Sequence, residues 1–183
     1  MAYYLITFSP TGGTAKTAEI LASAIAENWN SIDLLRPIPE TNLKADDVCL
    51  IAVPSFGGRI PTTSAERLHR ISANGARAIL VCVYGNRAYE DTLSELEDVL
   101  VSCGFDCTAA VAAIAEHSII REFGAGRPDA DDRAELTAFA EKIRERIANP
   151  TDEPLTVPGA HGTYKPFQNT PFIPAENDAC IKC

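Results

Sequence analysis

A pair of glycines flanked by hydroxyl side chains follows the first apolar segment of the chain. The run reads Ser9-Pro10-Thr11-Gly12-Gly13-Thr14. Backbone N–H groups at the start of a helix stabilise a phosphate, and glycine lets the backbone approach the anion closely. The run fits neither the P-loop spacing nor G-x-G-x-x-G. It predicts a phosphate site of another kind, although a helix-capping turn would use the same residue types.

Two later loops combine aromatic side chains with glycine. The first reads Pro54-Ser55-Phe56-Gly57-Gly58, and the second contributes Tyr84, Gly85, Asn86, Arg87 and Tyr89. A flat ring system needs an aromatic stacking surface and close backbone contacts, and both loops offer these. Main-chain N–H groups of the second loop are expected to hydrogen-bond the heteroatoms of such a ring. A plain surface loop with one buried phenylalanine is the alternative interpretation of the first.

The elements that must position these loops alternate along the chain. Apolar runs predict strands at 3–8, 31–35, 48–53, 78–84 and 105–114. Helical patterns predict four helices. The first follows residue 14, and the second runs from a capping box at 63–66 to Asn74-Gly75. The third includes residues 93–100, and the fourth extends from Asp129 to Asn149. Strands that are apolar on both faces indicate a parallel sheet covered by helices on both sides. The three loops then meet where the strands end, which is where such sheets bind ligands.

On these residues the chain resembles flavodoxin-like FMN-binding domains. The 9–14 run is similar to the flavodoxin motif Ser/Thr-x-Thr-Gly-x-Thr, and Gly85-Asn86-Arg87 resembles the corresponding loop of flavodoxin-like electron-transfer proteins. The resemblance implies an α/β flavodoxin-like doubly wound three-layer sandwich, with a five-stranded parallel sheet of order 2-1-3-4-5. It also implies that the three loops hold FMN, without a catalytic side chain. Gly13 departs from the family, since many flavodoxins carry asparagine there.

The C-terminal part of the chain has a different character. Six of the 12 prolines follow residue 149, so we expect the domain at 1–148 and an extended linker at 149–179, held by Tyr164, Phe167 and Phe172. Cys180 and Cys183 resemble the first half of the ferredoxin run C-x2-C-x2-C-x3-C-P.

This half-motif, at 180–183, suggests part of a flavodoxin–ferredoxin fusion, with a 4Fe-4S cluster only in a longer parent chain. Two thiolates cannot hold a four-iron cluster alone. A disordered end, a reversible disulfide and half of a shared zinc site remain open for the cysteine pair.

The composition narrows the function classes. A formal net charge of -9 argues against nucleic-acid binding and suits docking on a basic redox partner. The sequence offers no signal peptide and no membrane span, so a cytoplasmic location without membrane contact is expected.

We expect an electron carrier between FMN and an iron–sulfur centre, with a redox protein or tethered ferredoxin domain as partner. An FMN-dependent NAD(P)H:quinone or flavin reductase is one alternative. A docking or regulatory domain without FMN is the other. The oligomeric state is not predicted.

Overall fold

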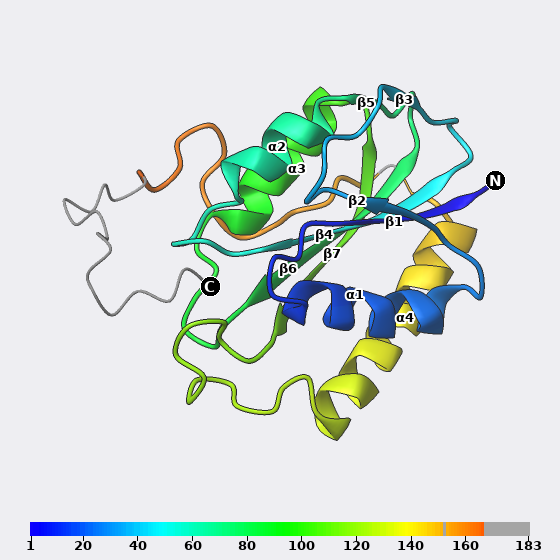
Figure 1. The fold of residues 1–183 in the computed structure, drawn as a ribbon. Helices are drawn as coiled ribbons and strands as arrows, with labels where there is room; N and C mark the ends of the chain where they lie inside the picture. Colours follow the sequence, from blue (N-terminus) through cyan, green and yellow to red (C-terminus); the bar gives the residue numbers. More distant parts are fainter. Residues whose placement is uncertain (152, 167–183) are drawn as a thin grey trace.

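A single parallel sheet forms the centre of the molecule (Figure 1). The computed structural model describes residues 1–151 and 153–166. The sheet has five strands in the order β2-β1-β4-β6-β7. Their bounds are β1 (Tyr3–Thr7), β2 (Asn30–Asp33), β4 (Val48–Pro54), β6 (Arg77–Tyr84) and β7 (Asp106–Ile114). The expected doubly wound α/β sheet and its strand order are therefore confirmed.

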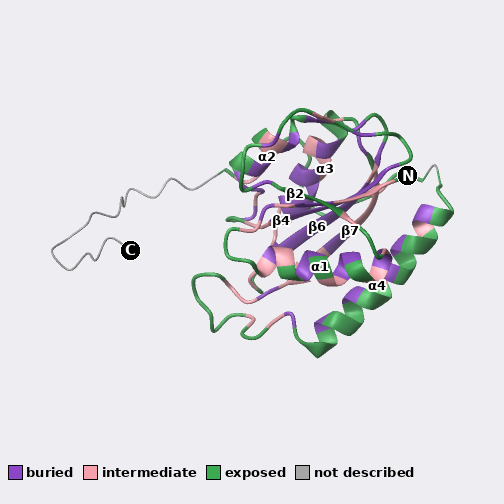
Figure 2. Ribbon diagram, turned by 45° about the vertical axis from the view of Figure 1, so that its right-hand side comes forward, coloured by how far each residue is buried: buried purple, intermediate pink, exposed green. Residues whose placement is uncertain are grey.

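Helices cover both faces of this sheet, because the central strands are apolar on both sides. The helices α1 (Gly13–Ile25) and α4 (Ala130–Ala148) pack on one face, and α2 (Thr62–Leu68) and α3 (Thr92–Ser102) pack on the other. In β4, Leu50 faces α1 and α4, whereas Ile51 faces α2 and α3. Figure 2 shows the buried strands enclosed between the two helical layers.

The start of α2 differs from the predicted capping box at 63–66. The helix begins at Thr62 behind Pro61, and no side chain caps it. Pro61 has φ −61°, and its carbonyl accepts the Ser64 N–H at 2.8 Å, so the proline sets the first turn. The Ser64 hydroxyl donates to the same carbonyl at 2.6 Å.

The end of α2 was also predicted wrongly. The helix stops at Leu68, and the chain then forms β5 (Ile71–Ser72), which pairs with β3 (Thr41–Asn42) in a separate two-stranded sheet. Asn74 and Gly75, with φ 53° and 85°, lie between β5 and β6 and do not end a helix. The prediction failed because the buried apolar residues Ile71 and Ala73 continue the helical spacing, although Ile71 belongs to β5.

The segment that follows α4 returns to the domain. Residues 153–166, here called the C-terminal strap, pass along α3 on the face that α2 and α3 cover (Figure 1). Val157 is only 6% exposed and belongs to the core of that face. Tyr164 contacts the domain, whereas Phe167 and Phe172 lie outside the described residues.

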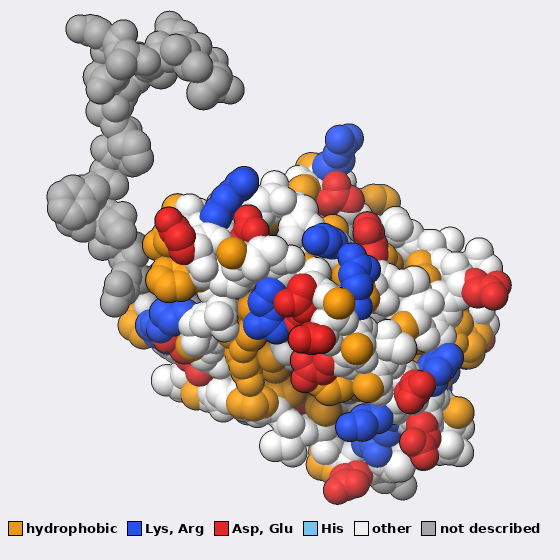
Figure 3. All heavy atoms as spheres, turned by 90° about the horizontal axis from the view of Figure 1, so that it is seen from below, with side chains coloured by type: hydrophobic (Ala, Val, Ile, Leu, Met, Phe, Trp, Pro, Cys, Tyr) orange, Lys and Arg blue, Asp and Glu red, His pale blue; other side chains and the backbone are white. Residues whose placement is uncertain are grey.

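The surface carries both charge signs. Seen from below, basic and acidic side chains lie around an uncovered group of hydrophobic ones (Figure 3). Phe56, Ile119, Ile120 and Phe123 are among the exposed large hydrophobic residues, and all four lie in loops. Among the described residues, the helices are either too short or too polar to cross a lipid bilayer.

Candidate functional site

The loops that follow β1, β4, β6 and β7 enclose one cavity of about 370 Å³. This size falls within the range of small-molecule sites. Its walls are formed by Pro10, Thr11, Gly13, Thr14, Pro54, Ser55, Phe56, Gly57, Val83, Tyr84, Gly85 and residues 115–119. The structure thus brings parts of all three predicted loops together at the carboxyl edge of the sheet.

The 9–14 loop presents the N-terminus of α1 to this cavity. Gly12 occupies the N-cap position with φ 86°, and the Ser9 hydroxyl accepts the Ala15 N–H at 2.9 Å. Within the described part of the chain, the N–H groups of Gly13 and Thr14 donate to no protein acceptor, and the Thr11 and Thr14 hydroxyls form no hydrogen bond. These donors lie on the cavity wall at the positive end of a helix, where an anion is stabilised.

A tight turn at 56–59 forms the second wall. Phe56 and Arg59 exchange two backbone hydrogen bonds, of 2.9 and 3.2 Å, across Gly57 and Gly58. Both glycines have positive φ, 61° and 88°, as a type I′ turn requires. The turn therefore needs glycine at its centre, and it leaves Phe56 46% exposed beside the cavity.

The loop after β6 forms the third wall with only part of its predicted residues. Tyr84 and Gly85 line the cavity. The Tyr89 ring packs edge-on against Tyr84 with centroids 5.2 Å apart, so it supports Tyr84 from the protein side. Burial raises the pKa of Tyr84, and the neighbouring Tyr89 adds to the effect. Tyr84 therefore stays a neutral phenol.

Six predicted site residues do not line the cavity. They are Ser9, Gly12, Gly58, Asn86, Arg87 and Tyr89. Ser9 and Gly12 shape the start of α1, and the Gly58 carbonyl accepts the Asp91 N–H at 3.0 Å. Their assignment as ligand contacts stays a prediction.

The segment after β7 forms a wall that was not predicted from the sequence. Residues 115–119 line the cavity, and His117 is half-buried among them. The His117 Nδ1 atom accepts the N–H groups of Ile119 and Ile120, at 3.1 and 3.0 Å, which fixes the ring. The only indication of this wall in the sequence is that the segment follows the fifth parallel strand, at the edge of the sheet where ligands bind.

The cysteines of the described residues form no site. Cys49, Cys82, Cys103 and Cys107 carry free thiols, and burial raises the pKa of Cys49, Cys82 and Cys107 to about 12. Such thiols are unreactive near neutral pH. No cluster of metal-ligating side chains occurs at residues 1–151 or 153–166. The predicted ligands Cys180 and Cys183 lie outside the described residues.

Comparisons with known proteins place the fold. No protein-family model matches the chain, and no curated protein matches its sequence. A flavodoxin of Streptococcus pneumoniae TIGR4 matches over 80% of this chain and 99% of its own, with 18% identity and a TM-score of 0.56. An NADH:FMN oxidoreductase in its apo form matches over 84% and 92%, with 16% identity and a TM-score of 0.57.

A third similar structure is an NAD(P)H:quinone oxidoreductase from Methanothermobacter marburgensis. It matches over 84% of this chain and 98% of its own, with 13% identity and a TM-score of 0.51. At these identities the likeness concerns the fold rather than the chemistry. The chain has the flavodoxin-like fold.

Proposed function

We propose that this protein binds FMN in the cavity at the carboxyl edge of the sheet and transfers electrons through it. The observation that carries the proposal is the pairing of two unlike halves in one cavity. Unbonded N–H groups and hydroxyls lie at the α1 N-terminus, and an exposed aromatic ring lies beside a glycine turn. A phosphate attached to a flat apolar ring matches both halves.

The residues present fit this cofactor. Gly13 leaves the phosphate side open, because even a Cβ there would lie 3.8 Å from the Ala115 Cβ, and Gly57 and Gly12 have open space around them. Thr11 and Thr14 would hold the phosphate, and Phe56 and Tyr84 would flank the ring. When bound, FMN supplies one- and two-electron redox chemistry. The protein orients the ring and limits its contact with water.

The finer parts of the proposal concern the electron partners. We propose a carrier that serves a redox protein or a tethered ferredoxin domain, with Cys180 and Cys183 as two ligands of a 4Fe-4S cluster in a longer chain. A cytoplasmic location is part of this proposal. The resemblance of the 180–183 segment to a ferredoxin run supports it.

A reductase is the second candidate function. The similar structures include an NADH:FMN oxidoreductase and an NAD(P)H:quinone oxidoreductase. The cavity also extends to Ala115 and the exposed Ile119, which add apolar surface that an organic acceptor would contact. Anaerobic mixing with NADH or NADPH separates the candidates. Bleaching of bound FMN, followed by turnover of an added quinone, would identify the reductase, and a carrier stays oxidised.

The binding proposal is tested with the double variant Thr11→Ala/Thr14→Ala. A hydrogen bond to a charged group contributes about 1.5–3 kcal/mol, so we expect FMN affinity to fall by about tenfold or more. Riboflavin lacks the phosphate, so its affinity should change little. Fluorescence quenching and calorimetry measure both dissociation constants. Wild-type protein that stays colourless and binds no FMN would refute the proposal, whereas equal losses for both ligands would refute the phosphate assignment.

A further inference from the structure

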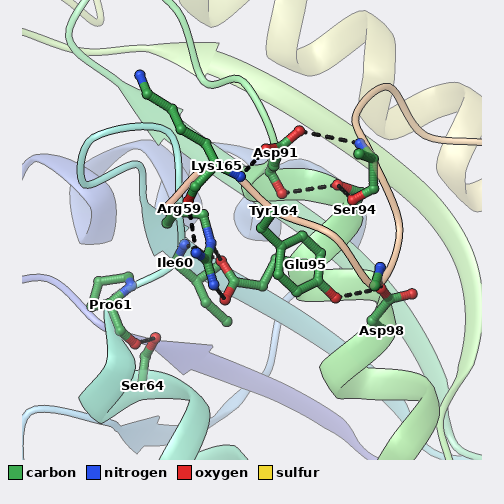
Figure 4. Close-up of polar contacts among 12 residues, drawn as sticks. Arg59, Ile60, Pro61, Ser64, Asp91, Ser94, Glu95, Asp98, Tyr164 and Lys165 are labelled. Carbon is green, nitrogen blue, oxygen red and sulfur yellow. Dashed lines mark hydrogen bonds and ion pairs between the residues drawn. The ribbon is translucent and has the colours of Figure 1, made fainter. Parts of the chain in front are cut away.

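The 56–59 turn is held from outside the cavity by a cluster of charged groups. The Arg59 guanidinium binds the Glu95 carboxylate of α3 through Nε at 2.7 Å and Nη2 at 2.5 Å (Figure 4). Glu95 also accepts the Ile60 N–H at 2.9 Å. Arg59 and Glu95 are only 15% and 11% exposed, so water screens this pair weakly. The two-point contact fixes the turn to α3.

The C-terminal strap completes this cluster. The Lys165 carbonyl accepts from Arg59 Nη1 at 2.8 Å, and the Tyr164 ring lies 4.7 Å from the guanidinium carbon (Figure 4). A cation above an aromatic face is attracted by the ring. The Tyr164 hydroxyl donates to Asp98 of α3. Residues 164 and 165 therefore cover the guanidinium from the solvent side.

Lys165 also contacts the loop that follows β6. Its N–H donates to Asp91 at 2.7 Å, and its Nζ donates to Glu90 at 2.7 Å. Glu90 lies against Gly58, where a Cβ would come within 1.9 Å of the carboxylate, and the Asp91 N–H donates to the Gly58 carbonyl. One strap residue thus contacts the base of both loops that flank the cavity.

The Asp91 carboxylate binds the C-terminal strap instead of capping α3. Asp91 occupies the N-cap position of α3, yet its carboxylate forms no cap hydrogen bond. The carboxylate instead accepts the N–H groups of Ala160 and Lys165, and these bonds lower its pKa. Glu90 has a φ of 44°, an unfavourable backbone region for this residue, and its bonds to Lys165 and Arg87 hold it there.

We infer that the C-terminal strap is a positioning element of the site: Tyr164 and Lys165 hold the 56–59 turn and the 84–91 loop at the spacing that the flavin ring needs. The inference rests on the proposed FMN site. The strap contacts no residue of the 9–14 loop in any hydrogen bond of the described structure. Its effect should therefore fall on the ring and not on the phosphate.

The test is the full-length double variant Tyr164→Ala/Lys165→Ala. Amide exchange of residues 55–60 without ligand should become about tenfold faster or more, because a local opening loses its closing contacts. Exchange in β6 should stay unchanged. Since preorganisation is lost, FMN and riboflavin should both bind roughly fivefold more weakly, by the same factor. Tyr164→Phe keeps the ring over Arg59 and should show a smaller effect.

Arg146→Ala is the matched control. It removes a strap contact at the other end, where Arg146 Nη2 donates to the Glu153 carbonyl at 2.8 Å. Residues 55–60 should exchange at the wild-type rate in this variant. Unchanged exchange at 55–60 in the double variant, or equal acceleration in β6, would overturn the inference. The exchange result needs no ligand, so it decides the role of the strap even if the wild-type protein binds no FMN.

Discussion

Gly85 shows how one missing side chain shapes the cavity. A Cβ at this position would lie 2.4 Å from His117 Cδ2 and 2.8 Å from His117 Cβ. His117 lines the cavity and is fixed by the N–H groups of Ile119 and Ile120. The absence of a side chain at residue 85 therefore allows the 115–119 wall to close against the end of β6.

We expect Gly85→Ala to destabilise the fold and to weaken FMN binding. Overpacking of this kind costs about 1–3 kcal/mol, because the 115–119 segment must move. Urea denaturation measures the free energy of unfolding. Adding His117→Ala should restore part of the lost stability, because it removes the clash with the imidazole ring and leaves only the clash with the Cβ of residue 117. If the Gly85→Ala protein is as stable as wild type, residues 115–119 can move away from the new Cβ without a cost in free energy, and the prediction is wrong.

At the scale of elements, the sequence predicts most of the scaffold. The strands β4 and β6 are apolar on both faces, and such sequences are typical of the central strands of a parallel sheet. The end of α2 could not be predicted. Ile71 continues the apolar spacing of the helix, and only its pairing with Thr41, thirty residues earlier in the chain, makes it a strand. Pairing over such a distance leaves no local signal.

The walls of the cavity were predictable only in the loops that contain glycine. Residues 115–119 contain no glycine, and their role follows from the place of β7 in the sheet. The C-terminal strap shows no helical or strand period. Single polar contacts to Asp91 and Asp98 hold it, and these partners cannot be paired from sequence spacing.

The strap should hold more firmly at mildly acidic pH. His161 Nδ1 lies 2.7 Å from Asp98, and Glu97 is 3.6 Å from its Nε2; the hydrogen bond to Asp98 raises the pKa of His161 above its usual 6.5. Protonated His161 therefore favours the folded state. Its contribution is complete below pH 6.5 and is lost as the pH rises through the folded-state pKa.

We expect His161→Gln to lower the unfolding temperature at pH 6 and to leave it unchanged at pH 9. The side chain is 48% exposed, so the contribution is at most about 1 kcal/mol. Thermal unfolding of both proteins at both pH values measures it. His69→Gln is the control, because the His69 ring contacts the Ala65 carbonyl and the Ser102 hydroxyl instead of a carboxylate. A difference of equal size at pH 9 would contradict the assignment.

At the scale of the whole molecule, the cavity is built from residues far apart in the chain. Thr11, Phe56 and His117 come from the loops that follow β1, β4 and β7, and Tyr84 is the last residue of β6. They lie together only when the sheet is formed, so the site exists in the native state and not in the unfolded chain. A ligand of this site must therefore stabilise the entire fold.

We expect FMN to raise the unfolding temperature in a concentration-dependent way. At a free concentration of 100 times the dissociation constant, linkage gives about 2.7 kcal/mol. For a domain of this size, each 1 kcal/mol corresponds to roughly 2–4 °C, so the shift should be about 5–11 °C. Thr11→Ala/Thr14→Ala should show a smaller shift at the same FMN concentration, because it binds less ligand. If the unfolding temperature stays constant even at high FMN concentrations, the cavity does not bind this cofactor.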